Sequence, residues 1–232
     1  MSTKADLGDP GAADLTHVET WIFDLDETLY DRQSGVLSEM EGRIETYLMQ
    51  QTGEDQPAVA LLRENMRHQY GSTLAALLAS GGADVEAYLA HVHDVPLDSL
   101  KPDLLLRAGL DRLPGRRLIH TNAPGFHAER VLEALGIADM FESVFHCAAA
   151  DYVLKPHKEA SDRMVAAYDL APAVCAFFED REANLAPAAA LGMTAILVGD
   201  QAKTSTADFI RYRTPALAPF LLSARVRKEP IP

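Results

Sequence analysis

The chain has 232 residues, 48% of them hydrophobic, with a formal net charge of −13 and a pI near 5.0. This apolar content is ample for a packed core, and the acidity argues against a nucleic acid polymer as partner, because such binding depends on Lys and Arg neutralising phosphates. A small anionic substrate remains compatible with this charge, since one local cluster of donors can hold it.

The first segment, residues 1–18, contains acidic residues, glycine and proline but no apolar stretch of the signal-peptide kind. We expect it to be a disordered tail. No window reaches the about 18 apolar residues of a membrane span, so no membrane association is expected. Cys147 and Cys175 lie in apolar segments without metal-ligand spacing, which predicts reduced core cysteines in a cytoplasmic protein.

Five short apolar runs are typical of buried parallel strands, and turns and helical patterns follow them. This alternation predicts an α/β fold with a Rossmann-like parallel sheet. The strands are expected at 20–24, 117–121, 143–146, 174–179 and 194–198. Intervening helices are expected at 125–135, at 156–168 with Pro156 in the first turn, and at 182–191, and a final strand and apolar helix at 208–222.

The interval between the first two strands is unusually long, because a parallel crossover needs only about a dozen residues. Apolar residues recur there at helical spacing, so we predict an inserted all-helical cap domain over 34–98. The core is then formed by 19–33 and 99–232, with a helix over 102–113 leading back into it.

Polar side chains gather where the predicted strands end, and in open α/β sheets ligands bind beyond the carboxyl ends of the strands. Clustered carboxylates repel one another unless a cation lies between them, and hard oxygen ligands suit Mg²⁺. Lysine, threonine and amide groups supply donors for phosphate oxygens. The residues concerned are Asp24, Asp26, Thr121, Asn122, Lys155, Glu179 and Asp180.

Four strings at these strand ends, DLDET, IHTNA, LKPH and FFEDREANL, occur in that order between residues 20 and 199. Together they resemble the four motifs of the haloacid dehalogenase superfamily of phosphohydrolases. A single DxDxT string would be weak, since acidic pairs also occur as helix caps. The resemblance implies a Mg²⁺-dependent phosphomonoesterase that acts through an aspartyl-phosphate intermediate.

The resemblance also implies roles for the first motif. Asp24 is expected to be the nucleophile, so that one hard displacement becomes two easier ones. Asp26 is expected to protonate the leaving alcohol, to deprotonate the attacking water, and to offer its backbone carbonyl to the metal. Thr28 is expected to orient Asp26.

The remaining motifs are expected to bind phosphate and metal. Thr121 and the Asn122 amide would hold the phosphoryl oxygens, and Lys155, preferred over Lys158, would neutralise the nucleophile and the phosphate. The implied metal set is completed by the last motif, in which Glu179 replaces a more frequent aspartate, so that its direct ligation stays open. That set is Asp24, Asp26, Asp180 and Glu179.

Strings in the predicted cap, HQYGSTLAAL and AYLAHVHD, and the run from LKPDLLL to residue 137 are similar to the pyrimidine 5′-nucleotidase branch. This implies a small substrate such as UMP or CMP. Gly71, Ser72 and Thr73 could form a polar loop at the phosphate site, with Tyr70 facing a base. Alternatively, Ser72 caps a helix and Tyr70 is core.

The sequence assigns no catalytic role to four histidines. His91 and His93 are expected at the surface or satisfied in the core, and His120 is expected to be buried in its strand. His127 lies either near the cleft, as the resemblance suggests, or in helix packing.

Other functions stay open. A sugar-phosphate phosphatase or phosphomutase would use the same aspartates, and a non-catalytic scaffold would use none of them. A dehalogenase is disfavoured, because that chemistry dispenses with the second aspartate and the acidic cluster. The sequence permits a monomer or a homodimer.

Overall fold

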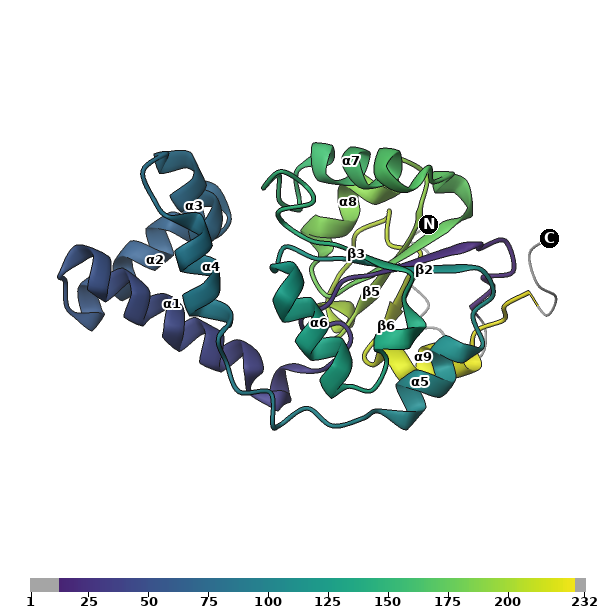
Figure 1. Cartoon of the computed structure of the whole chain (residues 1–232). Coiled ribbons are helices and arrows are strands. Elements are labelled where there is room, and N and C mark those ends of the chain that lie inside the picture. Colours follow the sequence, from purple (N-terminus) through teal and green to yellow (C-terminus); the bar gives the residue numbers. More distant parts are fainter. Residues whose placement is uncertain (1–12, 228–232) are drawn as a thin grey trace. The chain divides into compact units, whose positions relative to one another are not determined.

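The computed structural model describes residues 13–227, which divide into two compact units. The helical unit is Arg32–Ser99, and the core unit contains the described residues of 1–31 and 100–232. Figure 1 shows the elements of both.

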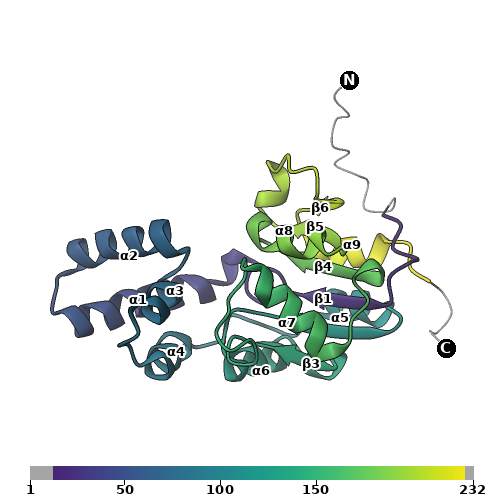
Figure 2. The same ribbon diagram turned by 90° about the horizontal axis from the view of Figure 1, so that it is seen from above.

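The core unit is built on a parallel sheet of six strands in the order β3-β2-β1-β4-β5-β6. Figure 2 shows the strands side by side, with β6 at one edge and β3 at the other. This arrangement confirms the predicted α/β fold and the final strand. The strands are β1 Thr20–Phe23, β2 Arg116–His120, β3 Ser143–Phe145, β4 Cys175–Glu179, β5 Thr194–Val198 and β6 Tyr212–Thr214.

Helices cover both faces of this sheet, α7 and α8 on one and α5, α6 and α9 on the other (Figure 1). They are α5 Leu104–Asp111, α6 Gly125–Ala134, α7 Lys158–Tyr168, α8 Glu182–Ala190 and α9 Leu217–Ser223, with short 3₁₀ turns at Ala138–Met140, Pro172–Val174 and Gln201–Lys203. The expectation that Pro156 opens α7 is wrong. The helix begins at Lys158, and Pro156 lies before it, after a cis peptide bond.

The central strand β1 is buried along its whole length, because helices cover both faces of the sheet. The ring of Phe23 stacks on that of Phe178 in β4 at 4.7 Å between centroids. The indole of Trp21 donates a hydrogen bond to the carbonyl oxygen of Pro114. Each such side chain stabilises the fold by about 1.5–3 kcal/mol on burial, so the strand that leads to Asp24 is held firmly.

The helical unit consists of η2 Arg32–Ser34, α1 Val36–Thr52, α2 Gln56–Tyr70, α3 Thr73–Ser80 and α4 Val85–His93. Three of its helices begin at capping residues: the side chains of Asp55, Ser72 and Asp84 accept hydrogen bonds from backbone N–H groups in the first turns of α2, α3 and α4. Arg63 is buried and its guanidinium lies 2.7 Å from a carboxylate oxygen of Glu45. Helix caps and ion pairs within the unit, of which Arg63–Glu45 is the buried one, therefore contribute to its stability.

Part of the segment expected to be disordered is packed. Ala13, Leu15 and Val18 are buried, and the Leu15 N–H donates to the carbonyl oxygen of Arg225. Burial of these side chains explains why this part of the segment is packed against the core. The expectation for 1–12 lies outside the described residues.

Cys147 and Cys175 are buried thiols, as predicted. Burial raises the pKa of Cys175 to about 11. Between residues 13 and 227, no helix combines the length and apolar character needed to cross a bilayer.

Candidate active site

The polar residues of three motifs meet at the carboxyl ends of β1, β2 and β4. Asp24 directly follows β1, and its N–H donates to the carbonyl oxygen of Phe178 at 2.9 Å. Thr121 directly follows β2, and its N–H donates to the carbonyl oxygen of Phe145 at 3.0 Å. Sheet hydrogen bonds thus continue into the site and fix the backbone of the residues that carry its side chains.

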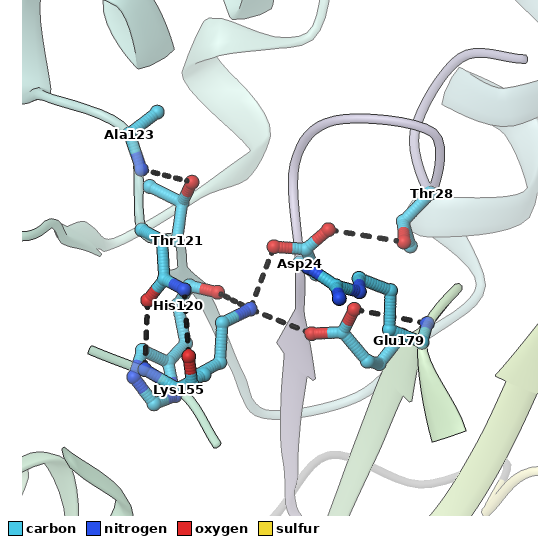
Figure 3. A network of polar contacts seen from close by, with 9 residues as sticks. Asp24, Thr28, His120, Thr121, Ala123, Lys155 and Glu179 are labelled. Carbon is cyan, nitrogen blue, oxygen red and sulfur yellow. Dashed lines mark hydrogen bonds and ion pairs between the residues drawn. The ribbon is translucent and has the colours of Figure 1, made fainter. Parts of the chain in front are cut away.

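Lys155 forms the centre of the site (Figure 3). Its ammonium lies 2.6 Å from Oδ1 of Asp24, 2.6 Å from Oε2 of Glu179 and 2.7 Å from the carbonyl oxygen of His120. The side chain is buried. Burial works to lower the pKa of Lys155, but Asp24 and Glu179 raise it above its ordinary value, so the lysine is a permanent cation here. Lys158, in contrast, is exposed and pairs with Asp162.

Thr121 and Asn122 hold the neighbouring loop. The hydroxyl of Thr121 accepts a hydrogen bond from the Ala123 N–H at 3.0 Å (Figure 3). The side chain of Asn122 donates to the Lys155 carbonyl oxygen at 2.9 Å and accepts from the Lys155 N–H at 2.8 Å. Because both ends of this side-chain amide bind the Lys155 backbone, Asn122 ties the Lys155 loop to the end of β2.

The position of Thr28 differs from the expectation that it orients Asp26. Its hydroxyl donates instead to Oδ2 of Asp24 at 3.3 Å. The turn between them explains the difference, because Glu27 adopts a left-handed backbone with φ of 63°. That turn brings Thr28 back over the first aspartate.

Oδ1 of Asp26 contacts Tyr30, to which the sequence assigned no role, and His127, whose place the sequence left open. The hydroxyl of Tyr30 donates to Asp26 Oδ1 at 2.5 Å, and Nε2 of His127 lies 2.9 Å from the same oxygen. His127 therefore lies beside Asp26 and is at the same time buried in the packing of the first turn of α6. Tyr30 was missed because it lies two residues beyond the DLDET string, four residues after Asp26.

Three carboxylates gather without a matching number of cations. Ligand atoms of Asp24, Glu179 and Asp180 lie within 4.8 Å of one another, the one such acidic, histidine or cysteine group found in the part of the chain that the structure describes. Burial and the charge of Glu179 raise the pKa of Asp24 to about 7, and burial, Glu179 and Asp24 raise that of Asp180 to about 10. These shifts mark a site in which the ionised carboxylates need a further positive charge.

The donor set fits Mg²⁺, which prefers carboxylate and carbonyl oxygens. Within it, Glu179 is already engaged, since Oε2 contacts Lys155 and Oε1 accepts from the Arg181 N–H at 3.2 Å. Both Asp24 oxygens have partners as well, Lys155 and Thr28, so direct ligation by Asp24 would exchange one of these contacts for the ion. The carboxylate of Asp26 lies outside this group, so Asp26 would contribute only its backbone carbonyl oxygen to the metal site.

The residues expected in the cap have ordinary structural contacts. Ser72 caps α3 by accepting from the Ala75 N–H at 3.0 Å, and Thr73 is buried. His93 is buried with Nδ1 2.9 Å from the Leu89 carbonyl oxygen. Tyr70 is 42% exposed, so the alternative that it belongs to the core is wrong. A substrate role for Tyr70, Ser72 and Thr73 stays a prediction.

His120 is buried in β2, as expected, with its ring stacked on that of Phe177. The ring of His91 packs 5.7 Å from that of Tyr47 within the helical unit. Neither imidazole is needed for the chemistry considered below.

Comparison with known proteins agrees with this geometry. Residues 18–192 match the haloacid dehalogenase-like hydrolase family, and the chain belongs to that family.

Individual relatives are more distant. Phosphate metabolism protein 8 of Saccharomyces cerevisiae is 28% identical over 191 residues, which cover 75% of this chain and 60% of that protein. This chain therefore spans less than two thirds of that relative.

Solved structures with a similar fold include two hydrolases of different kinds. A HAD phosphatase from Thermococcus onnurineus superposes with a TM-score of 0.58 at 14% identity, covering 86% of this chain and 94% of that one. A 2-haloacid dehalogenase from Pseudomonas syringae superposes with a TM-score of 0.54 at 18% identity, covering 89% and 98%. At these identities the likeness shows the fold alone, and the reaction must be argued from the site.

Proposed function

We propose that this protein is a Mg²⁺-dependent phosphomonoesterase that acts through an aspartyl-phosphate intermediate. The observation that carries the proposal is the position of the Lys155 ammonium, 2.6 Å from both Asp24 and Glu179, beside the acidic group that includes Asp180. Cationic and acidic groups together suit a phosphate dianion with a metal ion. A dehalogenase has no use for this acidic group, and a scaffold has no physical reason to keep buried carboxylates that repel one another.

In the first step, a carboxylate oxygen of Asp24 attacks phosphorus and the bond from phosphorus to the leaving oxygen breaks. Asp26 gives its proton to that oxygen, so a neutral alcohol departs. The hydroxyl of Thr121, the Asn122 N–H and the Lys155 ammonium stabilise the charge on the transferring phosphoryl group.

In the second step, Asp26 takes a proton from a water molecule, whose oxygen attacks phosphorus. The bond between phosphorus and Asp24 breaks, inorganic phosphate leaves and the free carboxylate returns. Throughout, Lys155 and Thr28 hold the two oxygens of Asp24 in place.

Asp24, Asp180 and the backbone carbonyl of Asp26 would hold the Mg²⁺, with Glu179 contacting a metal-bound water. When bound, the ion supplies positive charge that favours ionised carboxylates and reduces repulsion between nucleophile and phosphate.

The substrates we propose are pyrimidine nucleoside 5′-monophosphates such as UMP and CMP. Support comes from the similarity of the 68–77 and 87–94 strings to the pyrimidine 5′-nucleotidase branch, and Tyr70 keeps the exposure that stacking on a base requires. As part of this proposal, residues 34–98 act as the cap that selects the leaving group, on a core of 19–33 and 99–232. The second candidate is a sugar-phosphate phosphatase or phosphomutase, which the same core residues support.

The test is phosphate release from UMP, CMP, dTMP, AMP, GMP and hexose phosphates, with Mg²⁺ or with EDTA, for wild type and Asp24→Asn. We expect release that needs Mg²⁺, favours UMP or CMP, and falls by at least about 10³-fold in the variant. Preference for hexose phosphates would retain the chemistry and remove the nucleotide claim. No release from any substrate would favour the scaffold.

A further inference from the structure

The carboxylate of Asp26 differs from those of its neighbours in what holds it. Asp24 and Glu179 contact Lys155, whereas Oδ1 of Asp26 receives the Tyr30 hydroxyl at 2.5 Å and faces Nε2 of His127 at 2.9 Å. The chemical step assigned to Asp26 involves proton transfer, which depends on the direction of the carboxyl group.

The two contacts come from separate parts of the core unit. Tyr30 is 8% exposed and lies in the turn after β1, while His127 is fully buried in the first turn of α6. α6 follows β2, and its first turn packs closely: a Cβ added to Gly125 would lie 3.0 Å from the His146 ring. His127 thus belongs to a buried, closely packed helix start.

Two contacts on one oxygen fix the rotation of the carboxyl group. Once Oδ1 is held, the direction of Oδ2 is set as well, because the group is planar and its carbon is tied to the backbone. A misplacement of about 1 Å in a reacting group can cost about 10²-fold in rate. Phosphoryl attack by Asp24 uses other atoms, and its own oxygens are held by Lys155 and Thr28.

We propose that Tyr30 and His127 are positioning residues that act through Asp26, aligning it for proton transfer to the leaving oxygen and from water. This inference rests on the proposed phosphomonoesterase activity, though not on the nucleotide preference. It predicts a defect whose size depends on the leaving group, because an alkoxide needs a proton to depart whereas a nitrophenolate leaves as a stable anion.

The experiment measures kcat/KM for p-nitrophenyl phosphate and for the alkyl phosphate that wild type cleaves best, with saturating Mg²⁺. The quantity kcat/KM covers the steps up to departure of the leaving group and omits hydrolysis of the intermediate. Tyr30→Phe removes only the hydroxyl, and His127→Leu removes the imidazole. His127→Gln replaces the imidazole with an amide whose N–H can lie near the Nε2 position.

Tyr168→Phe is the matched control, because the Tyr168 hydroxyl also makes one side-chain hydrogen bond in the core unit, 2.8 Å from Ser143 Oγ, but does not contact Asp26. Circular dichroism and thermal unfolding of each variant check the fold. The control is expected to lower both values of kcat/KM by less than about 3-fold.

We expect Tyr30→Phe to lower kcat/KM for the alkyl phosphate about 10-fold and His127→Leu about 10²-fold, within the range of general acid catalysis. Both should change kcat/KM for p-nitrophenyl phosphate by less than about 3-fold, and His127→Gln should recover most of the loss. Equal falls for the two substrates in folded variants, or no fall for either, would overturn the proposal.

Failure of the proposed function has a different signature. If wild type releases phosphate from neither substrate, the phosphomonoesterase itself is wrong and the positioning role falls with it. If wild type is active but prefers sugar phosphates, only the nucleotide claim fails, and the same comparison of leaving groups still decides for or against Tyr30 and His127.

Discussion

Acidic side chains serve opposite purposes in the two units. In the helical unit, Asp55 and Asp84 cap helices and Glu45 pairs with Arg63. In the core unit, Asp24 and its acidic neighbours are crowded together, with raised pKa values for Asp24 and Asp180. The first arrangement satisfies each charge by a local partner, while the second leaves several charges competing for one lysine.

This difference indicates which acidic residues contribute to stability and which contribute to catalysis. Capping a helix stabilises a protein by about 1 kcal/mol, whereas collecting buried carboxylates costs free energy unless cations compensate. Substitutions in the helical unit should therefore lower stability and spare the chemistry. Those in the acidic group should remove chemistry and in some cases raise stability.

The largest effect is expected from Lys155→Met, because it leaves Asp24 and Glu179 buried without their cation. Removing one partner of a buried ion pair costs about 3–5 kcal/mol, and activity should be lost as well. Urea unfolding monitored by circular dichroism measures the first effect. Lys158→Met is the control, since that exposed pair contributes about 0–1 kcal/mol; equal stability of the two variants would contradict the role of Lys155.

The next effect is a pH dependence of the metal-free protein. Because the pKa of Asp24 is raised from 3.8 to about 7, the folded state binds more protons than the unfolded state between those values. Stability from this group is therefore present below pH 4 and falls as pH rises to 7, by on the order of 2–4 kcal/mol. The raised pKa of Lys155 changes nothing in this window, since the lysine is charged in both states.

Thermal unfolding of wild type and Asp24→Asn in EDTA, at intervals from pH 4 to pH 8, isolates this contribution. The melting temperature of the variant should rise relative to wild type as pH increases. Addition of Mg²⁺ should stabilise wild type more at pH 8 than at pH 6, because the ligands must lose their protons to bind. A difference between the two proteins that stays constant with pH would refute the argument.

A smaller effect of opposite sign is expected from Asp180→Asn, which removes a carboxyl group that must take up a proton on folding because its pKa is raised to about 10. Dependence of activity on Mg²⁺ should be lost. The metal-free variant should gain on the order of 1–2 kcal/mol at pH 8, which is a rise of roughly 2–8 °C in melting temperature for a chain of this size. A loss of stability would mean that Asp180 is not under strain in the metal-free protein.

The smallest effect is expected from Ser72→Ala, which removes the cap of α3 and should cost about 1 kcal/mol. The matched control is Asp84→Ala, which removes the equivalent cap of α4. If Ser72 has only this role, the two variants should have equal kcat/KM for UMP. A fall confined to Ser72→Ala would show that it also contacts the substrate.

Much of the core could be predicted from sequence because its signals are local. Each strand is a short apolar run, and the residues that follow it are brought together by the parallel order of the sheet alone. The contact between Lys155 and Asp24 was implied by the resemblance of the motifs, since Lys155 lies well beyond the end of β3.

Contacts that depend on the path of a single turn could not be predicted. The left-handed residue Glu27 decides that Thr28 faces Asp24 and leaves Asp26 to Tyr30 and His127. Composition also misled at residues 13–18, where Leu15 and Val18 are buried by the core despite their polar neighbours. In both cases distant parts of the chain decide the outcome.

The insertion of residues 32–99 between β1 and β2 has a consequence for the order of folding. The helical unit is one continuous segment whose helices contact one another, so its contacts can form without the rest of the chain. Strand β1 must wait, because Thr20 pairs with Arg116 on one side and with Cys175 on the other. During synthesis the strand that carries the nucleophile leaves the ribosome before both partners, and for that interval its apolar residues need protection from aggregation.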